Sequence, residues 1–258
     1  MTPAAEQLGI AVVTWNIQYG IAVEAAIEEI RSSPALSRFD VLLLQEMDEQ
    51  GTRAIATALD ADFAFASRRR HANTGRDFGN AVVSRRPIVE RAQVDLPHAA
   101  RVRGHERHAT FALVDVDGTS VGCYSVHTEV PLLPLSRRRE QFAHLAADIR
   151  DGSPDLVVVG GDFNTITSRG LRALDTALGE AGLRRVSSDV GPTYRRASGS
   201  RRLDHVFAAG RRPTGSGSAA TTASDHPPMG VDLVTERDPG ARRRAPGCGS
   251  SACRPARG

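Results

Sequence analysis

The stretch LVVVGGDFNT (156–165) places four apolar residues in a row, then two glycines, then an acid and an amide two residues later. A short aliphatic run of this kind is typical of a buried strand. The two glycines let the backbone turn sharply and let another group approach it closely. The abrupt change to Asp162 and Asn164 leaves two interpretations: a turn before the next helix, or a strand end that delivers polar side chains to a site.

The same pattern recurs along the chain, with polar residues at the edges of strand-like apolar runs. These residues are Asn16 (in VVTWN), Glu46 (in VLLLQE), His127 (in GCYSVH), Asp204 (in RLDHVF), and Asp225 and His226 (in ASDH). Strand ends that face one way bring residues far apart in sequence to a single cleft. The set therefore predicts one site.

Each of these residues taken alone has a structural interpretation. An asparagine after a strand is usually a turn or cap residue, and a buried histidine is usually a satisfied core residue. Asp204 inside a strand is harder to explain in this way, because an acid there needs a partner. The prediction of a site depends on six elements in order rather than on any one of them.

The residue types indicate the chemistry of this site. Carboxylate and amide oxygens without a thiolate favour Mg²⁺ or Mn²⁺ over zinc. Histidines beside carboxylates are typical of acid–base work, because an oriented imidazole can take a proton from water or stabilise developing charge. Together they predict metal-assisted hydrolysis of a phosphate ester.

The rest of the chain predicts strands that arrive in pairs, with helices between some of them. Helical spacing covers 23–32, 52–60, 136–151 and 169–182, with Ser136 as a capping residue. Asp117-Gly118 marks a hairpin turn, and 211–223 is expected to be a surface loop. This mixed order favours an α/β sandwich over a purely parallel doubly wound sheet.

Charge separates the body of the chain from its end. From Glu236 onward there are six arginines and two acids, a balance of +4, so the first 235 residues carry −1 of the overall +3. We expect a catalytic domain over 1–235 and a disordered Arg/Pro/Gly-rich tail over 236–258. The body is therefore no general polyanion binder of the kind that a basic patch announces.

Other features limit the class of protein. Three cysteines provide no disulfide framework. The N-terminal residues carry no signal-peptide pattern, and no run of about 18 apolar residues predicts a transmembrane segment. We therefore expect a cytoplasmic protein, and we expect it to be a monomer.

A set of motifs between Thr14 and His226 resembles the endonuclease/exonuclease/phosphatase superfamily, which includes DNase I-like nucleases, sphingomyelinases and inositol phosphatases. The motifs are TWN, LLLQE, GNAVVSRRPI, SVH, GGDFN, RLDHVF and SDH. The resemblance implies an α/β (α+β) fold of four layers, an αββα sandwich in which two packed mixed β-sheets are flanked by helices.

The resemblance also implies which residues bind the metal and the substrate. Asn16 and Glu46 hold or support Mg²⁺ or Mn²⁺, with Glu46 as the central ligand, and Asp225 belongs to the same side of the site. Arg76 and Asn80 lie in the part of the chain that forms a substrate-side loop in the family. Either residue could contact phosphate, and a turn at the start of a strand explains them about as well.

The remaining matches imply catalytic roles. Asp162 orients or activates the attacking water, and Asn164 positions that water and the phosphate. His226 contacts the scissile phosphate or acts as a base, with Asp204 fixing its tautomer. His127 is a second phosphate-facing histidine that stabilises the oxyanion or protonates the leaving group.

Differences between this sequence and the motifs of named subfamilies limit the classes of substrate. Ser125-Val126-His127-Thr128 stands where abasic-site endonucleases carry Tyr-x-Pro-Asn, and no Trp-x-Gly-Asp-x-Asn or Cys-Asp-Arg segment of inositol 5-phosphatases occurs. The leading hypothesis is a phosphodiesterase, with a nuclease acting on DNA or RNA as the alternative. A lipid head-group or inositol-phosphate phosphatase, a non-catalytic binding module, and a tail that tethers the protein to a polyanion are further alternatives.

Overall fold

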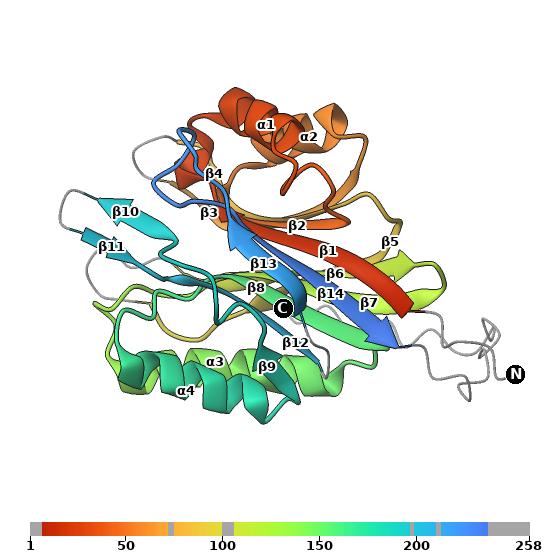
Figure 1. Cartoon of the computed structure of the whole chain (residues 1–258). Helices are drawn as coiled ribbons and strands as arrows, with labels where there is room; N and C mark the ends of the chain where they lie inside the picture. Colours follow the sequence, from red (N-terminus) through yellow and green to blue (C-terminus); the bar gives the residue numbers. More distant parts are fainter. Residues whose placement is uncertain (1–6, 72–74, 100–105, 197–198, 210–212, 237–258) are drawn as a thin grey trace, which may run out of the picture.

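The computed structural model describes residues 7–71, 75–99, 106–196, 199–209 and 213–236. Two six-stranded sheets pack face to face, with α1 and α2 on one outer face and α3 and α4 on the other (Figure 1). The four-layer αββα sandwich expected from the sequence is therefore confirmed.

The first sheet has the order β13-β14-β1-β2-β4-β3. Its strands are β1 (Gln7–Asn16), β2 (Val41–Met47), β3 (Asp62–Arg70), β4 (Asp77–Ser84), β13 (Pro213–Ser218) and β14 (Met229–Glu236). The helical segments on this side are the short η1 (Gln18–Gly20), α1 (Val23–Ser32) and α2 (Glu49–Ala58).

The second sheet has the order β5-β6-β7-β8-β12-β9, and β10 and β11 form a separate two-stranded ribbon. The strands of the sheet are β5 (Ile88–Asp95), β6 (His108–Val116), β7 (Thr119–His127), β8 (Leu156–Asp162), β9 (Leu183–Arg185) and β12 (Asp204–Ala209). The ribbon pairs β10 (Tyr194–Arg196) with β11 (Gly199–Arg201), and the helices on this side are α3 (Leu135–Asp151) and α4 (Ser168–Gly179).

The apolar runs of the central strands are continuous because both faces of each sheet are covered. On β2, Leu43 packs between the two sheets, whereas Leu42 and Leu44 pack in the layer beneath α1 and α2. On β8, Val158 packs between the sheets and Val159 packs in the layer beneath α3 and α4. Strand alternation thus divides one hydrophobic run between two core layers.

Strand direction brings the polar strand ends to one edge of the sandwich. β1 runs parallel to β2, and β7 runs parallel to β8. Within the second sheet, Asp162 lies in register with His127 on β7 and with Asp204 at the start of β12. The convergence predicted from the sequence is therefore seen in the second sheet.

The two glycines of the opening stretch permit close approach rather than a turn, because β8 continues through both of them to Asp162. A Cβ on Gly160 would lie 2.7 Å from Leu43 Cδ1 of the opposite sheet. A Cβ on Gly161, whose φ is 151°, would lie 1.9 Å from the carbonyl oxygen of Val126 on β7. The chain turns only at Asn164, whose φ is 50°.

Two local predictions are wrong. Residues 213–218, expected to be loop, form the edge strand β13, because backbone pairing with β14 needs no apolar side chains. Ser136 does not cap α3, which begins one residue earlier after Pro134 and has no side-chain cap.

Other expectations are not tested by the structure. Of the expected tail, residues 237–258 lie outside the described part of the chain. Within the described ranges, no helix is long and apolar enough to cross a membrane. The domain boundary, the cytoplasmic location and the monomeric state stay predictions.

Candidate active site

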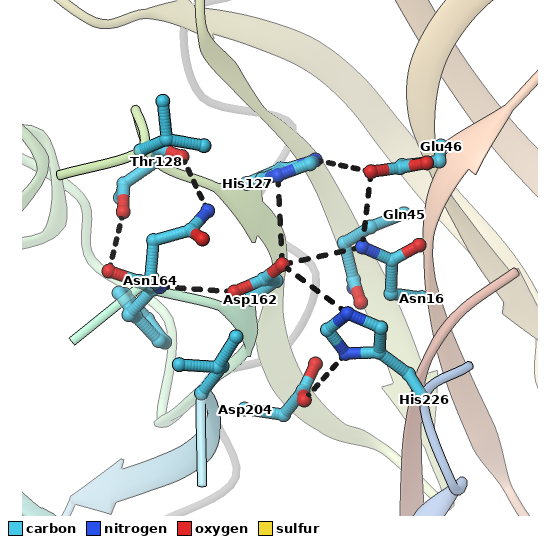
Figure 2. Close-up of polar contacts among 12 residues, drawn as sticks. Asn16, Gln45, Glu46, His127, Thr128, Asp162, Asn164, Asp204 and His226 are labelled. Carbon is cyan, nitrogen blue, oxygen red and sulfur yellow. Dashed lines mark hydrogen bonds and ion pairs between the residues drawn. The ribbon is translucent and has the colours of Figure 1, made fainter. Parts of the chain in front are cut away.

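Side chains from both sheets meet at the edge where β1, β2, β7 and β8 end. Figure 2 shows the polar contacts among these side chains, which come from strand ends and from the loop before β14. The predicted residues that this cluster brings together are Asn16, Glu46, His127, Asp162, Asn164, Asp204 and His226.

Glu46 reaches the cluster through an irregularity in β2. The pairing of β2 with β4 shifts between Gln45 and Met47, so Glu46 is the extra residue of a bulge, and its φ is 60°. Gln45 points into the interior instead, where its amide donates to the Ser125 hydroxyl at 2.9 Å. The bulge therefore aims the carboxylate of Glu46 at the open edge.

Asp162 and Asn164 form a tight turn directly after β8. The Asn164 backbone N–H donates to Asp162 Oδ1 at 2.9 Å, and the Asn164 amide donates to the Thr128 carbonyl at 3.1 Å. Arg138 on α3 donates to the carbonyls of Phe163 and Asn164 at 2.8 and 2.9 Å. The turn is thus fixed from two neighbouring elements.

Asn16 links the two sheets at the site. Its amide nitrogen donates to Glu46 Oε1 and to Asp162 Oδ2, both at 3.2 Å (Figure 2). Its oxygen accepts from the Gln18 backbone N–H at 3.0 Å. Asn16 therefore turns its nitrogen, not its oxygen, toward the carboxylates. One amide holds a carboxylate of the first sheet beside a carboxylate of the second.

Two histidines flank Asp162. His127 Nε2 lies 3.6 Å from Asp162 Oδ2, and His127 Nδ1 lies 4.0 Å from Glu46 Oε1. His226 Nε2 lies 3.9 Å from the same Asp162 oxygen, while His226 Nδ1 donates to Asp204 Oδ2 at 2.8 Å (Figure 2). His226 is thus the partner that the sequence required for the acid Asp204 inside a strand.

Burial and charge change the titration of these groups. Burial raises the pKa of Glu46 to about 7, and burial together with the nearby Asp204 charge raises the pKa of Asp162 to about 6. Burial acts to lower the pKa of His226, but the charge and hydrogen bond of Asp204 outweigh it and raise this pKa to about 10. Asp204 therefore favours the protonated form of His226.

The loop before β14 is attached to the end of β1. The Ser224 hydroxyl donates to the Asn16 carbonyl at 2.7 Å, and the Trp15 indole donates to the His226 carbonyl at 2.7 Å. Asp225 is half-buried beside His226, where its charge also raises the pKa of His226. A metal-binding role for Asp225 stays a prediction.

The two expected substrate-side residues have structural contacts. Arg76 pairs with Asp48 at 2.9 Å and donates to the carbonyls of Tyr19 and Gly20. Buried Asn80 donates to the His108 carbonyl at 2.7 Å, and it lines a small hollow together with His127. Phosphate contacts by Arg76 and Asn80 stay predictions.

Sequence reasoning missed two buried arginines near the site. Arg107, just before β6, donates to Glu129 at 3.3 Å and lines the same hollow as His127. Among the described residues its Nε and Nη1 have no hydrogen-bond partner, and its charge lowers the pKa of both Glu46 and Asp162. Arg138 is the other. In an arginine-rich chain, neither residue stands out in the sequence.

Comparison with models of known protein families identifies the family of this chain. The model of the endonuclease/exonuclease/phosphatase family matches residues 13–226. The chain belongs to this family. Its members are phosphoesterase hydrolases, and the match spans every predicted site residue.

Solved structures of other proteins share the fold. A family protein of Beutenbergia cavernae is 22% identical with a TM-score of 0.71, and the match covers 88% of this chain and 71% of that one. D. rerio TDP2 in complex with single-strand DNA product is 17% identical, with a TM-score of 0.69 and coverages of 88% and 99%. A Bacteroides thetaiotaomicron mannosyl-6-phosphatase is 16% identical, with a TM-score of 0.69 and coverages of 88% and 100%. No curated protein matches the sequence.

Proposed function

We propose that this family member is a divalent-metal-dependent phosphodiesterase that attacks a phosphodiester with water at the cluster of Figure 2. One observation carries the proposal: the carboxylates of half-buried Glu46 and buried Asp162 share the amide of Asn16, next to a histidine whose Nδ1 is hydrogen-bonded to Asp204 at 2.8 Å. This combination offers negative charge for a cation and positive charge for a phosphate.

The donor set suits a hard cation. Glu46 and Asp162 supply carboxylate oxygens, and burial raises the pKa of each, so a cation at the site would stabilise their charged forms. Oxygen donors without a thiolate favour Mg²⁺ or Mn²⁺. Glu46 is the proposed central ligand, with Asn16 as its support and Asp225 nearby.

Asp162, Asp204 and His226 also place three ligand atoms within 4.8 Å of one another. We assign the cation to the Glu46 side instead. Asp204 Oδ2 already binds His226 Nδ1, whereas on the Glu46 side the Asn16 amide holds two carboxylates beside each other. When bound, the cation would stabilise the charge that grows on phosphate oxygens in the transition state.

The protein residues divide the remaining work. Asp162, which Asn16 holds beside Glu46, orients the attacking water and accepts its proton. Asn164, fixed by the turn after β8, positions that water and the phosphate. His226 is the proposed contact to the scissile phosphate. Its raised pKa favours this role over that of a base, which would need the neutral ring.

Hydrogen-bond donors on the other flank of the site support the same reaction. His127 lies between Glu46 and Asp162 and is the proposed donor to the oxyanion or the leaving group. Arg107 shares a hollow with His127 and keeps two guanidinium nitrogens without protein partners among the described residues. Preorganised donors of this kind stabilise transition-state charge most effectively where water is excluded.

The test compares variants on bis(p-nitrophenyl) phosphate with Mg²⁺. We expect Glu46→Gln and His226→Gln each to lower kcat/KM by about 10²-fold or more, the usual size of a lost charge-stabilising group. Glu24→Gln, which alters an exposed carboxylate on α1, is the matched control and should retain the wild-type rate. Wild-type kcat/KM in either site variant would refute the proposal.

A further inference from the structure

The β10–β11 ribbon is attached directly to the catalytic cluster. The ring of Tyr194 lies 4.8 Å from the ring of His226, and the Arg195 backbone N–H donates to the Asp225 carbonyl at 3.0 Å. The hydroxyl of Thr193, just before β10, accepts from the Asp204 backbone N–H at 3.0 Å. The ribbon is therefore fixed beside His226 and lies at one end of the sandwich (Figure 1).

The register of the ribbon determines which side chains share the face of Tyr194. Tyr194 pairs with Arg201, and Arg195 pairs with Ser200. Directly opposite residues of an antiparallel pair lie on the same face, about 5 Å apart at Cβ. Arg201 is therefore beside Tyr194 on the face of the ribbon whose tyrosine contacts His226, and Arg195 is on the opposite face.

Arg201 is an exposed positive charge at this position. Both Arg201 and Arg195 are exposed, and neither has an ion-pair partner among the residues that the structure describes. The ribbon thus adds an exposed positive charge on the Tyr194 side of the cluster, where it can bind a second anionic group of an extended substrate.

We propose that Arg201 binds a second phosphate, adjacent to the scissile one, on a single nucleic-acid strand. The inference rests on the proposed phosphodiesterase function and names its substrate class. A nucleic-acid strand carries one phosphate per nucleotide, so a phosphate at His226 brings another within reach of the ribbon. None of the large hydrophobic side chains exposed in the described structure lies on the ribbon, which disfavours a lipid surface, where apolar residues insert.

Arg201→Gln tests the proposal, with Arg195→Gln as the matched control on the opposite face of the same ribbon. The first readout is fluorescence anisotropy of a labelled ten-nucleotide single-stranded DNA across a salt series in EDTA, where no hydrolysis occurs. We expect Arg201→Gln to weaken binding about 5- to 10-fold and to reduce the slope of log K against log salt by about 0.7. Arg195→Gln should change neither quantity.

The second readout is hydrolysis with Mg²⁺. We expect the loss in kcat/KM of Arg201→Gln to be at least fivefold larger on the oligonucleotide than on bis(p-nitrophenyl) phosphate, with unchanged thermal unfolding. Equal slopes for wild type and Arg201→Gln would overturn the proposal, and so would equal effects of the two variants. Wild-type binding to phosphatidylserine vesicles but not to the oligonucleotide would also overturn it. Failure of the wild type to hydrolyse any phosphodiester would instead refute the proposed function, because the binding readout does not depend on catalysis.

Discussion

Replacing Asp204 with asparagine separates two roles for His226. The pKa of His226 is raised from 6.5 to about 10, which corresponds to about 5 kcal/mol of preference for the protonated ring. Asp204 is the main source of this preference. In Asp204→Asn the hydrogen-bonding shape remains while the charge is lost, so the pKa of His226 should fall toward its ordinary value.

The size of the effect on rate follows from ionisation and orientation. With a pKa near 6.5, about one quarter of His226 is protonated at pH 7, a loss of about fourfold. Loss of the orienting carboxylate adds about 10- to 100-fold, the usual effect of removing such a partner. We therefore expect kcat/KM of Asp204→Asn to fall by about 10²-fold at pH 7.

The assay is kcat/KM on bis(p-nitrophenyl) phosphate with Mg²⁺ between pH 5 and 9, combined with an NMR titration of His226. If protonated His226 contacts the phosphate, the residual activity of Asp204→Asn is lost as pH rises through about 6.5. If His226 is the base, that activity increases with pH over the same range. An increase, or an unchanged rate at pH 7, would refute the reasoning.

Two further predictions concern stability. Gly161→Ala should destabilise the protein by about 3 kcal/mol or more, because the new Cβ meets the Val126 carbonyl at 1.9 Å. Gly160→Ala should cost about 1 kcal/mol, because the Leu43 side chain that the new Cβ meets can move. Thermal unfolding of both variants measures the difference, and equal losses of stability would contradict this prediction. Burial, together with the charges of Arg185 and Arg202, lowers the pKa of His205 to about 3. Below pH 6.5 the unfolded chain therefore binds a proton at His205 that the folded chain does not bind. The free energy of unfolding therefore falls as the pH drops. Urea unfolding should show that the wild type loses about 2 kcal/mol more than His205→Gln between pH 6.5 and pH 5, and identical pH slopes would contradict this.

Much of the fold could be predicted from local pattern. The helix over 23–32 has its expected bounds, and Asp117-Gly118 forms the expected turn with both residues at positive φ. The edge strand β13 could not be predicted, because its exposed serines and glycines carry no apolar alternation. Its stability comes from backbone hydrogen bonds to β14, which leave no trace in side-chain composition.

The site was predictable where a polar residue ends an apolar run, as Asp162 does. It was not predictable where a residue acts across a large sequence separation. The bulge that aims Glu46 depends on pairing between β2 and β4, and Arg138 reaches the turn at Asn164 from α3. Arg107 is one of many arginines in the chain, and only burial beside His127 distinguishes it.

Metal removal and restoration test the central claim most directly. Wild-type protein treated with EDTA should lose hydrolysis of bis(p-nitrophenyl) phosphate, and added Mg²⁺ or Mn²⁺ should restore it, whereas Glu46→Gln should not recover at the same metal concentration. Full activity of the wild type in EDTA, or full recovery of Glu46→Gln, would contradict a metal-dependent phosphodiesterase centred on Glu46.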